Sequence, residues 1–465
     1  MSAVQVPPQP QRLRVQAAKI RRRAPPPALV LVLGFAALIA IGTLLLMLPI
    51  SSQARSWTPP LEALFTSTSA VCVTGLVVVD TGTYWSGFGQ VVILLLMQAG
   101  GFGFMTGSTL LLLLLVGRRT SLRDRIAVQQ SLGAPQLGSV MALVRRIAVF
   151  TLALEAIGAA ALGARFLVGG EAGDPIRAAW WGIFHSISAF NNAGFDLFGE
   201  FRSVTAFVHD PVVLGLLGGL VVVGGIGYAI VGDVWQKRRW RRLAVETRLV
   251  LLTTLALLVV GTVAIAAIEW TQPRTLGSLP AEARVLNAAF HSAVARTAGF
   301  NSLDTSALLE PTLFGLMALM FIGGASGSPA GGIKVNTFSV LLVAIVSTAR
   351  GRPSAEAFGR RIQHETVYRA LAVALLSIAF VFAVGFALSL TSRAPFIELI
   401  FETVSAFATV GLSTGITREL EAVPRVLLIL AMFVGRLGPL TLVLALASQR
   451  QPVSFRPAVE SVRIG

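Results

Sequence analysis

The chain has 465 residues, of which 54% are hydrophobic and only 13% charged, and its mean hydropathy is +0.76. Such a composition excludes an ordinary soluble domain and indicates a polytopic helical membrane protein. The net charge of +16 does not indicate nucleic-acid binding, because the basic residues alternate with long apolar segments.

Apolar segments long enough to cross a bilayer of about 30 Å recur along the whole chain. The first, 28–48, follows Pro25-Pro26-Pro27, and we interpret it as a spanning helix and not as a cleaved signal. Further spans are predicted at 88–116, 147–168, 212–235, 249–268, 312–348, 370–391 and 425–447. The predicted fold class is therefore an all-α polytopic membrane protein with two spans in each of four repeats.

Lysine and arginine gather in every second loop. Six precede the first span, six lie in 118–146, six in 237–248, five in 350–369, and three follow the last span. Because cytoplasmic loops carry this excess, we predict a multi-pass protein of the inner (plasma) membrane with both termini in the cytoplasm.

A short polar segment that contains a glycine separates the two spans of each pair. The glycines recur at intervals of 105 to 119 residues, and each follows a similar lead-in by nine or ten residues. The segments are Val73-Thr74-Gly75-Leu76, Asn192-Ala193-Gly194-Phe195, Thr297-Ala298-Gly299-Phe300 and Thr409-Val410-Gly411-Leu412. The lead-ins are Phe65-Thr66-Ser67, Phe184-His185-Ser186, Phe290-His291-Ser292 and Phe401-Glu402-Thr403, and the third unit is one residue shorter than the others.

The stretches just before these glycines, 60–71, 178–190, 283–295 and 395–407, are too short to cross a bilayer. Each is predicted to be a pore helix that enters the membrane and turns back. The result is four helix–pore loop–helix repeats around a pseudo-fourfold ion pore. The predicted boundaries are a basic N-terminal tail 1–27, repeats 28–117, 118–236, 237–350 and 351–449, and a cytoplasmic tail 450–465.

None of the glycine segments contains Asp or Glu, which favours a monovalent cation held by backbone carbonyl oxygens. Irregular backbone at membrane depth is tolerated where it lines water or is buried in protein, and a filter meets that condition. Pore helices would also direct their carbonyl ends toward the ion. The alternative is that these glycines only allow helices to pack closely. The predicted filter residues are Val73, Thr74, Gly75, Asn192, Ala193, Gly194, Thr297, Ala298, Gly299, Thr409, Val410 and Gly411.

A second glycine-rich stretch, 323–334, interrupts the sixth predicted span. A straight helix would not accommodate so many glycines and Pro329, and the apolar region is too long for one span. We therefore predict two helices joined by an unwound intramembrane loop, with a simple kink or a cytosolic turn as the alternatives. The loop residues are Gly323, Gly324, Ala325, Ser326, Gly327, Ser328, Gly331, Gly332 and Lys334.

Arg436 lies near the middle of the last span, where an unpartnered charge costs roughly 2.5 to 3.5 kcal/mol. A functional role is therefore preferred over snorkelling to the surface. Lys334 either acts with it or reaches the cytoplasmic surface. Glu155 is expected to be satisfied by a neighbouring helix, and Arg296 to brace a loop through backbone carbonyls. The lone Cys72 excludes an intramolecular disulfide.

These four segments, the interrupted sixth span and the buried arginine resemble the Trk/Ktr/HKT superfamily of potassium transporters. The likeness extends over residues 28–450. A single span before the first segment favours the KtrB-type membrane subunit. The resemblance implies that the four glycines coordinate K⁺ and that Gly75, in place of serine, favours K⁺ over Na⁺. It implies a gate formed by the intramembrane loop and Arg436. Only Thr409-Val410-Gly411 approaches the repeated motif of potassium channels, which implies weaker selectivity.

The resemblance also implies partners. It predicts a homodimer in which each protomer has its own pore, and a cytosolic ring of nucleotide-binding RCK-type subunits. The basic loops 117–125 and 236–242 are candidate docking surfaces, although anionic lipid headgroups would explain them equally. No tightly bound cofactor is expected; K⁺ at the filter is the transported ion, and Na⁺ is a possible activator.

Two functional classes are compatible with the sequence. The first is a K⁺-conducting subunit, and the alternative is a Na⁺-permeable or cation-coupled secondary transporter. Conduction is preferred, because coupled carriers usually have inverted repeats, whereas these repeats all enter from one side. An enzyme is not expected, since no nucleophile–base constellation, paired metal-ligand spacing or ATP-binding motif is present. Gly101-Phe102-Gly103 and Gly225-Ile226-Gly227 are interpreted as parts of spanning helices.

Overall fold

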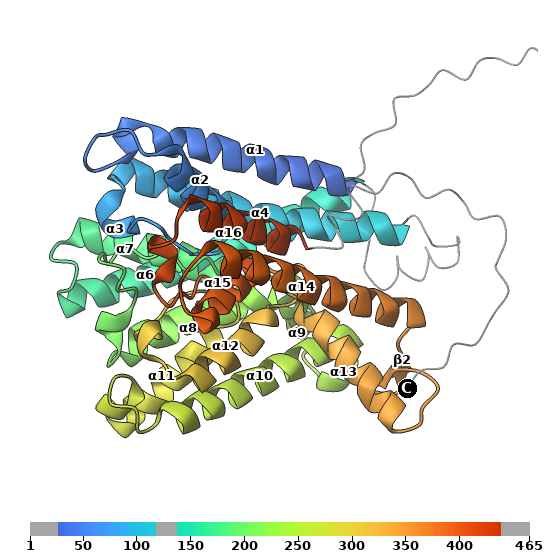
Figure 1. Ribbon diagram of the computed structural model, residues 1–465. Helices are drawn as coiled ribbons and strands as arrows, with labels where there is room; N and C mark the ends of the chain where they lie inside the picture. The colour runs from blue at the N-terminus through green and yellow to red at the C-terminus, as the bar shows by residue number, and fades with distance from the viewer. Residues whose placement is uncertain (1–26, 118–136, 439–465) are drawn as a thin grey trace, which may run out of the picture.

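The computed structural model describes residues 27–117 and 137–438. The predictions for the N-terminal tail, for loop 118–136 and for everything after 438 lie outside the described residues. Within them the chain is helical apart from connections and one short hairpin, β1 (Glu356–Ala357) with β2 (Arg360–Arg361). The predicted all-α polytopic fold is confirmed, and most long helices run along one dimension of the molecule (Figure 1).

Each repeat begins with a long helix and a short helix, and one or two further helices follow. Repeat 1 contains α1 (Pro27–Met47), α2 (Pro60–Val71), the short α3 (Thr81–Tyr84) and α4 (Gly87–Gly117). Repeat 2 contains α6 (Leu137–Gly169), α7 (Pro175–Phe190), α8 (Pro211–Ile226) and α9 (Tyr228–Lys237). Repeat 3 contains α10 (Val245–Glu269), α11 (Ala281–Val294), α12 (Glu310–Phe321) and α13 (Val335–Ala349). Repeat 4 contains α14 (His364–Thr391), α15 (Phe396–Ala408) and α16 (Ala422–Leu437).

Single 3₁₀ turns lie in the connections. They are η1 (Pro49–Ser51), η2 (Thr205–Phe207), η3 (Trp240–Arg242), η4 (Leu276–Ser278), η5 (Thr305–Ala307) and η6 (Ile416–Arg418).

Helix starts in repeat 2 follow directly from the sequence. Asp174 accepts bonds from the free amides of the first turn of α7, and Asp210 does the same for α8. A proline follows each aspartate, at a position where a missing N–H costs nothing. The chain thus enters each helix at a defined residue, which in turn places the polar segment at the far end of α7.

The repeats close into a ring. One helix that follows the polar segment of each repeat packs against the short helix of the next: α4 against α7, α8 against α11, α12 against α15, and α16 back against α2. Within repeats 1 to 3, a glycine on the long helix admits a serine hydroxyl from the short helix, which donates to a long-helix carbonyl. These pairs are Ser67 with Ile39 (2.8 Å), Ser186 with Glu155 (2.7 Å) and Ser292 with Leu258 (2.9 Å), beside Gly42, Gly158 and Gly261.

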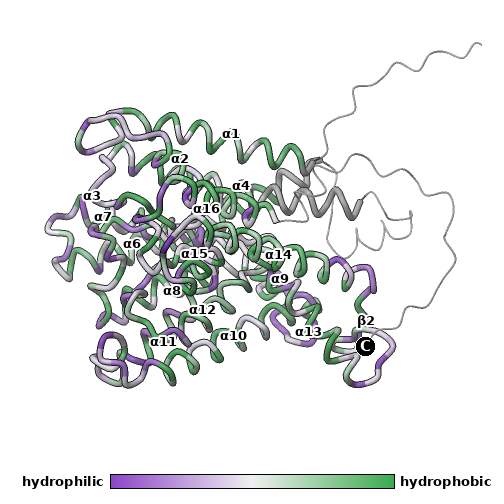
Figure 2. Tube along the Cα trace, viewed as in Figure 1, coloured by the Kyte–Doolittle hydropathy of each residue, from purple (hydrophilic) through white to green (hydrophobic). Residues whose placement is uncertain are grey.

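The outer helices present an apolar surface. Only 22 to 28% of the apolar windows of α1, α6, α10 and α14 is buried, against 56% for α4. Figure 2 shows these helices as hydrophobic along most of their length, with polar residues in the connections. Within residues 27–117 and 137–438, five helices are long and apolar enough to cross a membrane, or six if α8 and α9 count as one span. Such surface is stable only against lipid, so this is a multi-pass membrane protein.

The predicted continuous span 212–235 is wrong. α8 ends at Ile226, and α9 begins at Tyr228 after a bend of 88°. Gly227 between them has φ +80°, and a Cβ added there would lie 3.3 Å from Ser328. The break leaves room for the segment 322–334, which separates α12 from α13 without regular structure, as expected for a helix–loop–helix arrangement.

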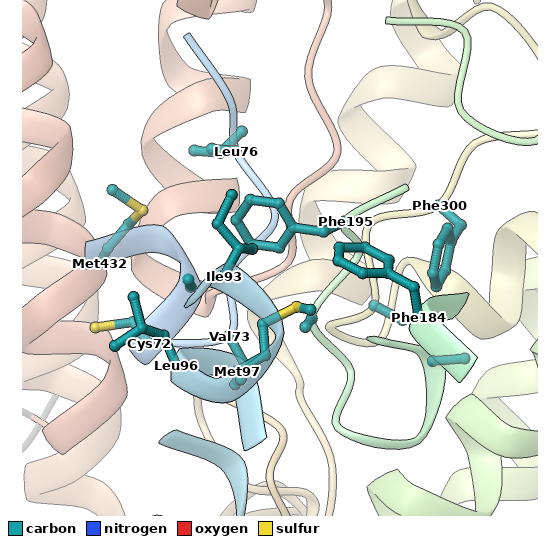
Figure 3. Close-up of a cluster of buried hydrophobic side chains, with 14 of the residues drawn as sticks. Cys72, Val73, Leu76, Ile93, Leu96, Met97, Phe184, Phe195, Phe300 and Met432 are labelled. Atoms are coloured by element: carbon teal, nitrogen blue, oxygen red, sulfur yellow. The ribbon is translucent and has the colours of Figure 1, made fainter. Parts of the chain in front are cut away.

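The apolar core surrounds the polar segments. Cys72, Val73 and Leu76 belong to one buried cluster with Ile93, Leu96 and Met97 of α4, and Phe195 and Phe300 from the segments of repeats 2 and 3 belong to it as well (Figure 3). All of these side chains are almost completely buried. The irregular backbone of the segments is therefore held inside protein, the condition under which it is stable at membrane depth.

Candidate ion pore

The four glycine segments meet in a closed ring. Each glycine lies against the carbonyl oxygen that precedes the next glycine around the ring, so that an added Cβ would collide with backbone. The contacts run from Gly75 to Ala193, from Gly194 to Ala298, from Gly299 to Val410 and from Gly411 back to Thr74. Only glycine fits at these positions, because the colliding atoms belong to main chain that cannot rotate away.

The segments also share an unusual backbone conformation. Each glycine has a positive φ, between +71° and +95°, and so does the residue two places before it. Those residues are Val73, Asn192, Thr297 and Thr409. A left-handed conformation at a non-glycine residue costs of order 1 to 3 kcal/mol and persists only where the surroundings impose it. Its occurrence in all four segments indicates one shared geometry and not accidental strain.

Serine side chains hold three of the segments from behind. The Oγ atoms of Ser69 and Ser405 accept bonds from the amides of Gly75 and Gly411, each at 3.1 Å. Ser188 instead donates to the carbonyl of its segment. In repeat 3, Ala298 N donates to Val294 O at 2.9 Å, one residue closer along the chain than the matching bonds elsewhere. This difference accounts for the missing residue of the third unit.

A second row of anchors lies beyond the glycines. His185 accepts a bond from the amide of Leu197 (3.2 Å), and His291 accepts one from Leu303 (3.1 Å). In each case the amide lies twelve residues after the histidine. The two histidines therefore hold backbone, and among the described residues no group of three or more metal-ligating side chains gathers around them.

The fourth repeat has a carboxylate in the equivalent position. Glu402 accepts a bond from the amide of Thr414 (3.0 Å), again twelve residues on. The sequence alone did not indicate this role for Glu402, although Glu402 occupies the same place in its lead-in as the two histidines. In repeat 1 the position is Thr66, whose buried hydroxyl has no hydrogen-bond partner.

A cavity of about 390 Å³ opens onto the glycine ring from one end of the molecule. All four glycines line its floor, and the segments that follow them form its wall. Its charged lining residues are Asp196, Glu200, Arg202, Asp304 and Arg418. The cavity thus leads to the four glycines from the connections that follow the short helices α2, α7, α11 and α15. The hairpin and α13 lie at the opposite end of the molecule from α3 (Figure 1).

The intramembrane segment 322–334 lies on the other side of the ring. A Cβ added at Gly331 would overlap Thr409, and one at Gly323 would lie 3.2 Å from the Thr297 side chain. Bonds from Gly323 N to Ile333 O (2.9 Å) and from Ala325 N to Gly225 O (2.8 Å) hold the segment. The second acceptor is a carbonyl at the break between α8 and α9.

The remaining predicted loop residues lie within this segment. Ser326 N bonds to the side chain of Asn336, and Ser328 donates to Ala325 O. Gly324 O accepts from Val335 N, and Gly327 and Gly332 both have positive φ.

Two cations fix the segment. The Arg436 side chain is 1% exposed and donates to Pro329 O in the segment and to Gly100 O (2.9 Å) in α4. Lys334 donates to Ala330 O, so it turns back onto the segment and does not reach the cytoplasmic surface. Both cations lie over the ring of Phe104, at 4.5 Å for Arg436 and 4.8 Å for Lys334. Such contacts are worth more when desolvated.

Two further buried charges have structural partners. Arg296 donates to Gly323 O (3.0 Å), so the loop that it braces is the intramembrane segment and not the third glycine segment. Glu155 accepts bonds from Gln98 (3.0 Å) and Asn191 (2.8 Å), on α4 and at the end of α7. Neighbouring helices satisfy Glu155, as expected, and it does not line the cavity.

Comparison with known proteins places these features in context. A sequence profile of the TrkH family, described as cation transport proteins, matches residues 6–456. The chain is 41% identical over 426 residues to the Ktr system potassium uptake protein B of Bacillus subtilis (strain 168), covering 91% of this chain and 94% of that one. It is 42% identical over 442 residues to the protein of the same name from Vibrio alginolyticus, covering 94% of each.

A third relative and one solved structure are also similar. The potassium/sodium uptake protein NtpJ of Enterococcus hirae is 34% identical over 453 residues, covering 96% of this chain and 99% of its own. The crystal structure of the potassium transporter TrkH from Vibrio parahaemolyticus matches with a TM-score of 0.71 and 18% identity, covering 92% of this chain and 86% of that one. At this identity the match concerns the fold.

Proposed function

The chain belongs to the TrkH family of cation transport proteins, and from this premise we propose that it is the K⁺-conducting membrane subunit of a potassium uptake system. The closed ring of four glycine segments at the floor of an open cavity carries the proposal. Two relatives named for potassium uptake are 41% and 42% identical to this chain over 94% of their length.

In this proposal the four segments form the selectivity filter. K⁺ enters the cavity, loses water, and is bound by backbone carbonyl oxygens of the twelve predicted residues from Val73 to Gly411. The membrane potential drives entry, at about 2.3 kcal/mol per charge for each 100 mV. Segment 322–334 lies beneath the filter and acts as the gate, held closed by Arg436 and Lys334.

The orientation follows from the basic loops. The cavity faces outward, and both termini lie in the cytoplasm of a bacterial inner membrane. We further propose a homodimer and a cytosolic ring of nucleotide-binding RCK-type subunits, as the family resemblance implies. A relative that is named as one lettered protein of a Ktr system supports the presence of a second protein in that system. The exposed basic turn around η3 (Trp240–Arg242) is the proposed docking surface among the described residues, with anionic lipid as its other occupant.

A second candidate function has one specific observation in its favour. A relative 34% identical over nearly the whole chain is named for potassium and sodium uptake. A Na⁺-permeable or Na⁺-coupled transporter would use the same cavity and ring, and Na⁺ could equally be an activator.

Flux into proteoliposomes separates the two candidates. The purified full chain is reconstituted into liposomes loaded with K⁺. Rubidium-86 uptake is then driven by the outward K⁺ gradient, with Na⁺ or K⁺ added outside as competitor. We expect uptake that K⁺ suppresses at far lower concentration than Na⁺. Equal suppression by Na⁺, or uptake that requires a Na⁺ gradient, would support the second candidate. No uptake above empty liposomes, even with a nucleotide-binding partner present, would contradict both.

Outside pH should affect uptake through Asp196. Burial and the neighbouring Asp80 carboxylate raise the pKa of Asp196, in the cavity wall, to about 7. Above this pH the ionised carboxylate attracts cations, and below it the group is neutral. As the outside pH rises from about 6 to about 8, we expect the half-saturating K⁺ concentration to fall by about two- to fivefold.

Asp196→Asn is the control for this pH effect. In that variant the half-saturating concentration should stay near the acidic value at every pH. An unchanged pH dependence would assign the effect to another group.

A further inference from the structure

We propose that Glu402 is a specificity-determining positioning residue: it fixes the fourth filter segment and thereby sets the preference for K⁺ over Na⁺. This inference rests on the proposed function. Glu402 lies in α15, one position after Phe401, and is 0% exposed. It does not line the cavity itself, but Ser413, Thr414 and Thr417 do, so the carboxylate stands directly behind the cavity wall.

Both carboxylate oxygens are used. Oε1 accepts bonds from Ser413 Oγ (2.6 Å) and Thr414 N (3.0 Å), and Oε2 accepts from Thr417 Oγ1 (2.6 Å). Gly415 N in turn donates to Ser413 Oγ (2.9 Å), so the serine hydroxyl has its own proton free for Glu402. None of the ion pairs in the described part of the chain includes Glu402. Its partners are therefore the backbone and hydroxyls of the segment that follows Gly411.

Each glycine segment and the residues that follow it form one wall of the ring. The four walls are held by different numbers of hydrogen bonds as a result. The carboxylate holds three residues of the fourth wall, whereas His185 and His291 each hold one amide of their walls. Thr66, at the same position of the first wall, holds nothing. Hydrogen bonds to a carboxylate are also stronger than those between neutral groups. The fourth wall is thus the most firmly fixed of the four.

Fixing one wall affects ion choice through the size of the ring. The wall held by Glu402 begins two residues after Gly411, whose neighbours in the ring are Thr74 and Gly75. A carbonyl cage discriminates between K⁺ and Na⁺ only if its oxygens keep their number and spacing as the ion changes. A wall released from its anchor can move inward around the smaller Na⁺ ion, which removes the penalty that Na⁺ otherwise experiences.

Glu402→Gln tests the inference in the full chain. Glutamine keeps an oxygen for Thr414 N but replaces the second acceptor by an amino group. In the proteoliposome assay we expect the ratio of half-inhibiting Na⁺ to half-inhibiting K⁺ to fall by about three- to tenfold, the net effect of about one lost hydrogen bond. The maximal uptake rate should stay within about twofold, a separation that general destabilisation would not produce.

Glu269→Gln is the matched control. Glu269 is also 0% exposed and accepts the same kinds of bond: two threonine hydroxyls, at 2.5 and 2.6 Å, and one amide at 2.9 Å. It lies at the end of α10 and does not line the cavity. This variant should lose stability by a similar amount but keep the ion preference of the wild type.

Four further outcomes have distinct meanings. A wild-type ion preference in Glu402→Gln would overturn the inference, and so would an equal loss of preference in Glu269→Gln. If Glu402→Gln does not fold, Glu402→Asp takes its place, because the shorter carboxylate reaches only part of the wall and should shift the ratio in the same direction. Absence of K⁺ preference in the wild type would contradict the proposed function itself, and is thus separable from failure of this inference.

Discussion

Replacing Gly75 by serine is expected to abolish the preference for K⁺ over Na⁺ and to lower K⁺ uptake by about ten- to hundredfold. Gly75 has φ +88°, and a Cβ at this position would overlap the carbonyl oxygen of Ala193. Serine must therefore either shift its own backbone or displace the next wall. Either change moves carbonyl oxygens of the proposed filter. Rubidium-86 uptake with Na⁺ and K⁺ as competitors measures both effects.

Gly34→Ser is the control for this substitution. Gly34 lies in α1 with a normal helical φ, and nothing lies within 4 Å of an added Cβ. It should show wild-type uptake and ion preference. If Gly75→Ser keeps the preference of the wild type, the first segment is not part of the filter, and the ring geometry has another purpose.

Replacing Arg436 by methionine is expected to raise K⁺ uptake in the absence of any soluble partner by at least about tenfold. The arginine holds segment 322–334 through Pro329 O and joins it to α4 through Gly100 O. Each bond from a charged donor contributes about 1.5 to 3 kcal/mol, and methionine makes neither. A closed gate held by these bonds would open far more often. The initial rate of rubidium-86 uptake into proteoliposomes measures the change.

Two variants make this prediction specific. Arg436→Lys keeps the positive charge but lacks the fork that reaches two carbonyls, so an intermediate rate is expected if the bonds hold the gate. A rate equal to that of the wild type in Arg436→Lys would show that charge alone blocks the ion. Arg369→Met removes an exposed cation at the start of α14 and should leave uptake unchanged. A wild-type rate in Arg436→Met would remove the arginine from the gate.

The sequence predicted the fold well where a local pattern was sufficient. The four glycine segments and their short helices were recognised because a polar, glycine-containing turn is rare inside an apolar chain unless the chain re-enters the membrane there. Phe65 and Ser67 and their counterparts in the other repeats showed the same lead-in each time, and α2 spans the predicted residues 60–71. The family resemblance inferred from these motifs is confirmed by the profile match and by the relatives.

The break at Gly227 was missed for a physical reason. Glycines within an apolar run are common in spanning helices, where they allow close packing, so Gly225 and Gly227 did not indicate a bend. The residue that packs against the bend is Ser328, which is distant in the sequence and lies 3.3 Å from the position that a Cβ at 227 would occupy. A pattern within one helix does not contain that information.

The partners of the buried charges were equally beyond local reasoning. Arg436 was recognised as costly in the membrane, but Gly100 and Pro329 contribute only carbonyl oxygens, which every residue possesses. Glu402, in the middle of α15, is not indicated by its own stretch of sequence, because none of its hydrogen-bond partners lies in that helix. Its role as a backbone anchor is recognised only in the structure, where the amide twelve residues later donates a hydrogen bond to it, as in the repeats with His185 and His291.

The closed ring of repeats lies within a single polypeptide, and this determines how many walls of the pore a single substitution alters. In a pore built from four identical subunits, one altered codon changes every wall at once. Here one codon changes one wall of four, so the ring can depart from equivalence in single steps. The matched position after the lead-in phenylalanine already differs between the walls, with a carboxylate in one, a histidine in two and a threonine in one. Exchanging these residues between walls would change the ion preference by altering one wall at a time.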